Sequence, residues 1–163
     1  MRGSGALIVF AREPRKGYVK TRLAATIGAC EATAIYTSLL ARTLRIAERS
    51  KFTARFVFAA QARETDYFID RLEADRWTVR AQCAGDIGQR MNDAFDRLLP
   101  VHRFVVLIGS DVADFSLADL DRAFDSLDCL PDSAVVGPSV DGGYWLLGIG
   151  KDPTPLLTNM SWS

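Results

Sequence analysis

The residues best suited to chemistry begin with a basic segment at residues 14–23, which reads PRKGYVKTRL. With Arg12 it places five cations within eleven residues, in a chain whose formal net charge is zero. The segment follows an apolar run at residues 6–11 and leads into an amphipathic stretch, which is the kind of strand-to-helix junction where α/β proteins bind phosphate. Gly17 permits the positive φ of a tight turn around a ligand. We therefore predict an anion site, with a solvated surface turn as the alternative.

Cations at the start of the predicted helix strengthen this interpretation. Lys20 and Arg22 fall in its first turn, where positive charge opposes the helix dipole and a bound anion would balance it. The segment is no Walker A loop, because no Gly stands five residues before Gly17 and Lys20 follows Gly17 after only two residues. The candidate nucleotide-binding residues of this segment are Arg12, Lys16, Gly17, Lys20, Thr21 and Arg22.

A second candidate is Asp111, which follows the predicted strand at residues 103–108, a segment that is fully apolar after Arg103. A carboxylate at the end of a buried strand does nothing for stability there, whereas Mg²⁺ or Mn²⁺ binds carboxylates together with phosphate oxygens and water. We predict that Asp111 faces the basic segment and binds one of these two metals, with a turn or capping role as the alternative. Asp114 is either a further ligand or part of a helix cap.

A third candidate is the segment GPSVDGGYW at residues 137–145. Asp141 could bind the metal or act as a base toward an acceptor hydroxyl, and with Lys20 it is a candidate catalytic residue. Gly142, Gly143 and Tyr144 are candidates for acceptor binding, because the glycines leave room and the ring offers stacking surface. The alternative is an ordinary hairpin turn, for which Asp-Gly is a common pair.

A fourth candidate is the glycine-containing turn at residues 82–91, which follows a short predicted strand. Gly85 and Arg90 could bind the base or ribose of a nucleotide. The alternative is a plain helix start with Asp86 as the N-cap.

The elements that must position these residues alternate along the chain. Apolar, β-branched runs predict strands at residues 6–11, 53–60, 77–81, 103–108, 134–137 and 144–148. Helical periodicity predicts helices at residues 20–27, 30–49, 64–75, 89–99 and, after Ser116 as N-cap, up to residue 127. In the second of these helices the predicted core stripe is Ala34, Leu39, Leu40, Leu44 and Ala47. This alternation predicts an α/β fold with three layers, α/β/α, and a mostly parallel sheet.

Composition narrows the function classes. With 163 residues, 48% of them hydrophobic, the chain is sized for a single domain at residues 1–163. Twenty basic residues balance twenty acidic ones, which argues against nucleic-acid binding and favours a small-molecule partner. Its three cysteines have no metal or disulfide spacing, and the first apolar run is too short to span a membrane, so we expect a cytoplasmic protein. Association into a homodimer is neither predicted nor excluded by the sequence.

Taken together, four motifs resemble those of the bacterial radical-SAM and selenodomain-associated glycosyltransferases, in the nucleotide-diphospho-sugar transferase superfamily. The motifs are FAREPRKGYVKTRL at residues 10–23, the segment at residues 82–91, IGSD at residues 108–111 and GPSVDGGY at residues 137–144. The resemblance implies the glycosyltransferase A fold, a nucleotide over the first strand, a divalent metal at Asp111 and an acceptor near Asp141.

The same resemblance sets the functional expectations. It implies glycosyl transfer from a nucleoside diphosphate sugar to a small acceptor, with Lys16, Lys20 and Arg22 holding the diphosphate. Nucleotidyl transfer from a nucleoside triphosphate to a phosphorylated acceptor is the first alternative, since the fold serves both. Val112 and Ala113 replace the Ser or Cys and the Pro usual in that family, and its members continue past the Trp-Ser motif, so we expect a C-terminal truncation. A non-catalytic nucleotide-binding protein is therefore a second alternative.

Overall fold

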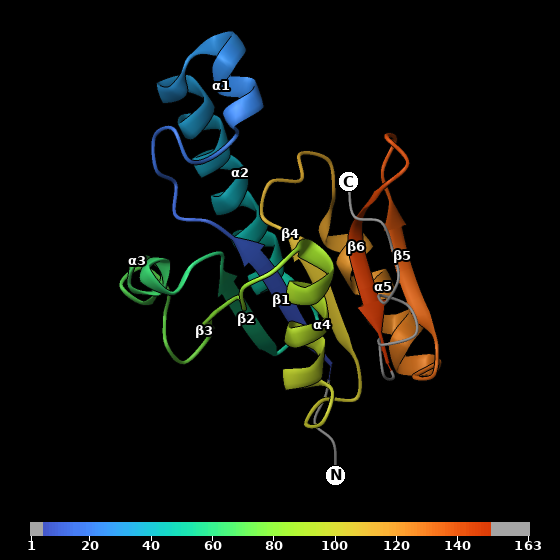
Figure 1. Cartoon of the computed structure of the whole chain (residues 1–163). Helices are drawn as coiled ribbons and strands as arrows, with labels where there is room; N and C mark the ends of the chain where they lie inside the picture. Colours follow the sequence, from blue (N-terminus) through green and yellow to red (C-terminus); the bar gives the residue numbers. More distant parts are fainter. Residues whose placement is uncertain (1–4, 151–163) are drawn as a thin grey trace.

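A single mixed sheet organises the chain (Figure 1). The computed structural model describes residues 5–150, so the expectation about the chain's C-terminal end lies outside the described residues. The sheet has six strands in the order β3-β2-β1-β4-β6-β5. The strands are β1 (Ala6–Ala11), β2 (Ala54–Ala59), β3 (Thr78–Ala81), β4 (Val105–Gly109), β5 (Ala134–Pro138) and β6 (Tyr144–Ile149).

Helices cover both faces of the sheet, which confirms the predicted three-layer α/β/α fold (Figure 1). The helices are α1 (Thr21–Ile27), α2 (Ala29–Arg49), α3 (Thr65–Ile69), α4 (Ile87–Leu98) and α5 (Leu117–Cys129), with a 3₁₀ turn at Ala62–Glu64. Alternate residues of β1 explain the two layers. Leu7 and Val9 pack in a core with α2 and α5, while Ala6 and Ile8 pack in a second core with α4. None of the helices within residues 5–150 is long and apolar enough to cross a membrane.

The strand directions decide where a ligand can bind. β3, β2, β1 and β4 run parallel, whereas β6 is antiparallel to β4 and to β5. The chain moves from β1 outward to β2 and β3, and then returns to place β4 on the other side of β1. Adjacent β1 and β4 therefore form a topological switch point, where α/β sheets bind ligands beyond the carboxyl ends of their strands. Because β6 is antiparallel, the loop between β5 and β6 lies at this same edge.

Two sequence predictions about helices are wrong in detail. The predicted helix at residues 64–75 is much shorter, because α3 ends at Ile69 and a turn follows. The buried stripe of α2 is also displaced from the predicted one: Leu40 and Ala47 are buried as expected, but Ala34 is exposed. The buried residues of α2 are Ala32, Tyr36, Leu40, Thr43 and Ala47. Two of these are polar, and apolar periodicity alone does not reveal them.

Candidate functional site

A cavity of about 830 Å³ opens at the switch point, beyond the carboxyl ends of β1 and β4. It gathers cations of the basic segment and two carboxylates from distant parts of the chain. Its lining residues are Arg12, Tyr18, Val19, Lys20, Thr21, Arg22, Leu23, Tyr36, Asp111 and Asp141. The structure thus brings together three of the four sequence motifs around one space.

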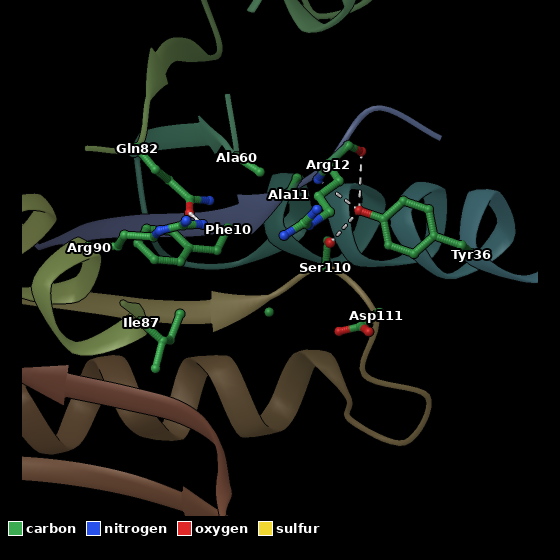
Figure 2. A pocket seen from close by; sticks show the side chains of 11 residues that line it. Phe10, Ala11, Arg12, Tyr36, Ala60, Gln82, Ile87, Arg90, Ser110 and Asp111 are labelled. Carbon is green, nitrogen blue, oxygen red and sulfur yellow. Dashed lines mark hydrogen bonds between the residues drawn. The ribbon is translucent and has the colours of Figure 1, made fainter. Parts of the chain in front are cut away.

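A smaller hollow of about 230 Å³ adjoins the cavity and shares Arg12, Tyr36 and Asp111 with it (Figure 2). Its walls come from the ends of β1 and β4, from the segments after β2 and β3, and from the start of α4. The remaining lining residues are Phe10, Ala11, Ala60, Gln82, Ile87, Arg90, Gly109 and Ser110. The hollow combines apolar walls with the guanidinium groups of Arg12 and Arg90. This combination suits a flat ring that carries polar atoms at its edge.

Backbone conformation shapes the basic segment. Gly17 has φ 82°, as predicted from its position in a tight turn. Lys20 also has a left-handed backbone, with φ 48° and ψ 44°, and it precedes α1 as its N-cap. The helix therefore begins at Thr21, one residue later than predicted. This turn directs the Lys20 side chain at Asp111, and their Nζ and Oδ2 atoms lie 2.7 Å apart.

Lys16 lies away from both hollows, although the sequence places it among the phosphate-binding candidates. Its exposed side chain lies beside Cys30 and Glu31, at the start of α2. Hydrogen bonding with Cys30, aided by the negative charge of Glu31, raises the pKa of Lys16. Gly17 does not line the cavity either, so its contribution is to the path of the backbone.

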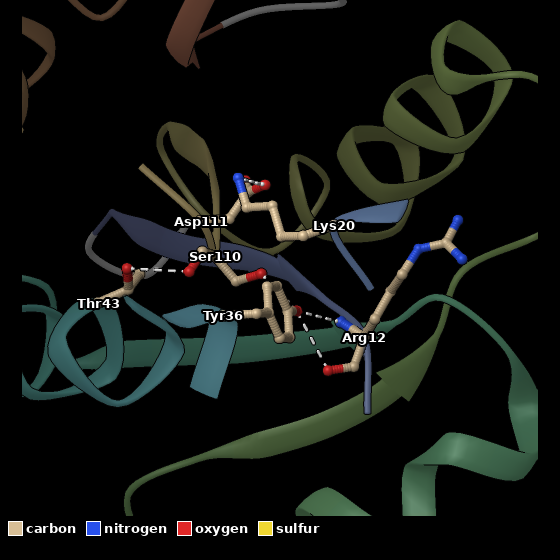
Figure 3. A network of polar contacts seen from close by, with 6 residues as sticks. All are labelled: Arg12, Lys20, Tyr36, Thr43, Ser110 and Asp111. Carbon is tan, nitrogen blue, oxygen red and sulfur yellow. Dashed lines mark hydrogen bonds and ion pairs between the residues drawn. The ribbon is translucent and has the colours of Figure 1, made fainter. Parts of the chain in front are cut away.

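Tyr36 of α2 ties the two central strands together at their carboxyl ends (Figure 3). Its hydroxyl accepts a hydrogen bond from the Arg12 backbone N–H at 2.8 Å and donates to the Arg12 carbonyl at 3.1 Å. The same oxygen lies within hydrogen-bond distance, 2.9 Å, of Ser110 Oγ. Burial raises the pKa of Tyr36, which keeps the phenol protonated and able to donate.

Two further residues of α2 hold the loop that carries Asp111. Thr43 Oγ1 donates to the Ser110 carbonyl at 3.3 Å, and Arg42 donates to the Phe115 carbonyl at 2.5 Å. The Arg42 guanidinium also lies over the Phe115 ring. Tyr36 and Thr43 are seven residues apart and therefore share one face of the helix. Tyr36 was not among the residues predicted from the sequence, although a tyrosine among buried helix positions signals a required hydrogen-bond partner.

Asp141 lies at the tip of the β5–β6 hairpin, so the alternative interpretation of this segment as a hairpin turn is correct for its backbone. Ser139 N–H donates to the Gly143 carbonyl at 2.9 Å and closes the loop. The Asp141 carboxylate accepts hydrogen bonds from the Ser139 hydroxyl and from the Gly143 N–H. These two donors, with Ser139 the stronger, hold the pKa of Asp141 below its ordinary value. The hairpin and the cavity are compatible, because Asp141 also lines the larger cavity.

The acceptor candidates near Asp141 contribute in different ways. Gly142 has φ 88°, which suits the turn, and neither it nor Gly143 lines the larger cavity. Tyr144 is half-buried, donates to Met91 Sδ at 3.8 Å and packs against the core under α4. Burial raises its pKa. Tyr144 lines neither hollow and so does not contact the space where an acceptor would bind.

The segment after β3 begins a helix, and its Arg90 lines the smaller hollow. Asp86 caps α4 in a capping box with Gln89, which confirms the helix-start interpretation. Arg90 Nε donates to the Gly85 carbonyl at 2.9 Å, and its Nη1 lies 3.5 Å from Gln82 Oε1. Gly85, with φ 119°, therefore orients Arg90 rather than lining the hollow itself.

The donor set of the larger cavity suits a hard divalent cation. Asp111 and Asp141 supply carboxylate oxygens, and no cysteine or histidine is among its lining residues. Within the described part of the chain, no three potential metal-ligating side chains form a cluster. Mg²⁺ and Mn²⁺ need only one or two carboxylates when substrate phosphates and water complete their coordination. The residues present therefore fit such a metal when it arrives with a phosphorylated ligand.

Comparison with known proteins agrees with this architecture. The profile of the DUF2064 family, described as an uncharacterized protein conserved in bacteria, matches residues 43–163, more than half of the chain. No curated protein matches. A protein of Desulfovibrio desulfuricans G20, provisionally described as a nucleotide-diphospho-sugar transferase, is 27% identical and superposes with a TM-score of 0.87. That match covers 98% of this chain and 69% of the other.

Two more distant structures share the fold alone. The Rv0371c protein of Mycobacterium tuberculosis H37Rv, in complex with manganese, is 17% identical, with a TM-score of 0.60 over 98% of this chain and 77% of its own. A cytidylyltransferase of Leptospira borgpetersenii is 16% identical, with a TM-score of 0.60 over 96% of this chain and 63% of its own. The fold is thus of the nucleotide-diphospho-sugar transferase and cytidylyltransferase type, as predicted.

Proposed function

This chain belongs to the DUF2064 family, and we propose that it catalyses the metal-dependent transfer of a glycosyl group from a bound nucleotide. Its fold and its cavity support this function. The donor is a nucleoside diphosphate sugar, and a small molecule accepts the glycosyl group. One observation carries the proposal: a single cavity at the switch point contains Lys20 and Arg22 together with Asp111 and Asp141. The narrower resemblance to radical-SAM and selenodomain-associated glycosyltransferases supports the same reaction.

The cations supply the diphosphate site. Arg12, Lys20 and Arg22 line the larger cavity, and preorganised positive charge there stabilises the negative charge that develops on a departing diphosphate. Arg12 also lines the smaller hollow, so a nucleotide can place its nucleoside there while its phosphates extend toward Lys20. Gln82 and Arg90 then lie beside the nucleoside. Lys16 is left out of this arrangement, which revises its predicted role.

Asp111 would hold the divalent metal, with Asp141 as the second carboxylate of the cavity. A metal bound there would neutralise phosphate charge and favour departure of the leaving group. A distant structural relative was crystallised with manganese, which supports testing Mn²⁺ first. Tyr36 and Thr43 keep the Asp111 loop in place through Ser110.

Asp141 is better suited to orienting an acceptor than to deprotonating it. Hydrogen bonds from Ser139 and Gly143 lower its pKa, which makes its carboxylate a weaker base. A charged carboxylate can still accept a hydrogen bond from an acceptor hydroxyl and fix its direction. We therefore favour orientation of the acceptor by Asp141 over the role of a base.

The test is a product analysis that also decides between the two transfer reactions. The chain is incubated with Mn²⁺, a set of acceptors, and either nucleoside diphosphate sugars or nucleoside triphosphates. Release of a nucleoside diphosphate supports glycosyl transfer. Release of pyrophosphate supports nucleotidyl transfer instead, which the fold shared with a cytidylyltransferase makes worth including. Binding of a nucleotide with Mn²⁺ but without any turnover would contradict both and favour a non-catalytic nucleotide-binding protein.

A further inference from the structure

Lys20 and Asp111 form an ion pair with each other in the cavity. Lys20 Nζ lies 2.7 Å from Asp111 Oδ2, with the two side chains 28% and 47% exposed (Figure 3). The proposed function assigns these two residues to different partners, a phosphate for Lys20 and a divalent cation for Asp111. While the ion pair is intact, a cation at Asp111 therefore lies beside an ammonium group, and a phosphate at Lys20 lies beside a carboxylate.

Lys20 makes this contact from an unusual backbone conformation. Among residues 5–150, Lys20 is the one residue other than glycine with a positive φ. A left-handed conformation costs a residue with a side chain about 1 kcal/mol. Lys20 lies between the turn at Gly17 and the start of α1 at Thr21, and in this conformation its ammonium group contacts Asp111.

Resting on the proposed function, we propose that the Lys20–Asp111 ion pair couples metal binding to nucleotide binding. A divalent cation that binds Asp111 alone lies close to the Lys20 ammonium group, which repels it. A nucleotide whose phosphate binds Lys20 alone lies close to the Asp111 carboxylate, which repels it. When both bind together, Asp111 receives the cation, Lys20 receives the phosphate, and every charge in the cavity has a partner.

The ion pair therefore lowers the affinity for each ligand alone, and this loss of affinity is absent when the two ligands bind together. Coupling of this kind is reciprocal, because the factor by which nucleotide tightens metal binding equals the factor by which metal tightens nucleotide binding. Removing Lys20 removes the penalty on the metal, so the free protein should bind metal more tightly. This result is opposite in sign to the loss expected if Lys20 were only a part of the binding site.

The experiment measures Mn²⁺ affinity from the electron paramagnetic resonance signal of free Mn²⁺, with and without a nucleoside diphosphate. ADP, GDP, CDP and UDP are screened first, and the tightest binder is used. In Lys20→Met without nucleotide, we expect Mn²⁺ affinity to rise about three- to tenfold, the range for a partly exposed ion pair. The coupling factor between Mn²⁺ and nucleotide should fall by about the same amount. Lys20→Asn is a second variant, because Asn tolerates the left-handed backbone.

Two control variants separate the ion pair from general charge effects. Arg22→Met removes another cation that lines the cavity, and Lys51→Met removes a lysine paired with Asp125 on a remote surface. Mn²⁺ affinity without nucleotide should rise much less in Arg22→Met than in Lys20→Met, and it should not change in Lys51→Met. Equal rises in Lys20→Met and Arg22→Met would overturn the inference, because the effect would then be one of net charge.

The remaining outcomes distinguish this inference from the proposed function. If the parent chain binds Mn²⁺ and nucleotide but neither Lys20 variant binds Mn²⁺ more tightly, the coupling role is wrong and the proposed function stands. If the parent chain binds neither Mn²⁺ nor any of the four nucleotides, the proposed function is wrong and the inference falls with it.

Discussion

The Tyr36 hydroxyl lies 2.9 Å from the Ser110 hydroxyl, although the two residues are 74 positions apart in the sequence. Both residues are only 4% exposed. Because Tyr36 also bonds both backbone groups of Arg12, one phenol holds the ends of β1 and β4 at the rim of the cavity. The positions of Arg12 and Asp111 relative to each other depend on this contact.

Tyr36→Phe tests this relationship. The substitution removes the oxygen and leaves the Arg12 N–H and the buried Ser110 hydroxyl without it, at a cost of about 1–3 kcal/mol in the free energy of unfolding. For a chain of this size, each 1 kcal/mol lowers Tm by about 2–4 °C. Urea denaturation and thermal melting measure both quantities. The control is Tyr67→Phe, whose hydroxyl has no recorded hydrogen bond within residues 5–150, and it should stay within about 0.5 kcal/mol of the parent.

Asp111→Asn tests the metal site. We expect the amide to abolish the extra thermal stabilisation that Mn²⁺ adds to a nucleotide complex, because a neutral oxygen binds a hard cation far less well than a carboxylate. Differential scanning fluorimetry with and without Mn²⁺ provides the measurement. Asp114→Asn is the matched control, since Asp114 is exposed in the same loop and lines neither hollow. An unchanged Mn²⁺ effect in Asp111→Asn would mean that the metal binds elsewhere.

Arg12→Met and Lys16→Met separate two cations that look alike in the sequence. Arg12 lines both hollows, so its loss should weaken nucleotide binding about tenfold or more, as for a hydrogen bond to a charged group. Lys16 lies outside both and should change affinity by less than about twofold at physiological salt, where its charge is screened. Isothermal titration calorimetry with the best nucleotide compares them. A larger effect at Lys16 would show that the phosphates lie along the outer part of the basic segment.

Ser116→Ala tests the N-cap of α5, and we expect its effect on stability to depend on pH. Ser116 and Asp119 form a capping box, and the Ser116 hydroxyl holds the pKa of Asp119 below its ordinary value. Loss of the cap should cost about 1 kcal/mol at neutral pH. Because the pKa of Asp119 is lower in the folded state, its stabilising effect is present above about pH 4 and disappears as the pH falls through the folded pKa.

The measurement for this helix cap is urea denaturation of parent and variant at pH 7 and pH 3. The difference between the two proteins should shrink at the lower pH. Ser126→Ala is the control, because Ser126 lies within α5, where its hydroxyl donates to the Arg122 carbonyl and contacts no carboxylate in the recorded hydrogen bonds. Its effect should not vary with pH. A constant difference for Ser116→Ala would contradict the contribution of Asp119.

Local chemistry was sufficient to predict much of the fold. The apolar run of β1 was predicted with its observed limits, and Ser116 was predicted as the cap that it forms. Gly17 has the positive φ that its turn requires. These features depend on the identity of a residue and its near neighbours, so a short stretch of sequence contains the information. Residues 70–75 show the limit: their pattern suits a helix, but the chain turns there to reach β3.

The contents of the site were only partly predictable. The sequence by itself determined that cations follow β1, that a carboxylate follows β4 and that the fold is α/β. Tertiary structure alone decided that Lys16 points away while Lys20 meets Asp111, since a single left-handed residue sets that direction. It also decided that Asp141 joins the cavity, because β6 runs antiparallel to β4 and returns its hairpin to the edge where the parallel strands end. Strand pairing over long range follows from packing of the whole sheet, and no local pattern encodes it.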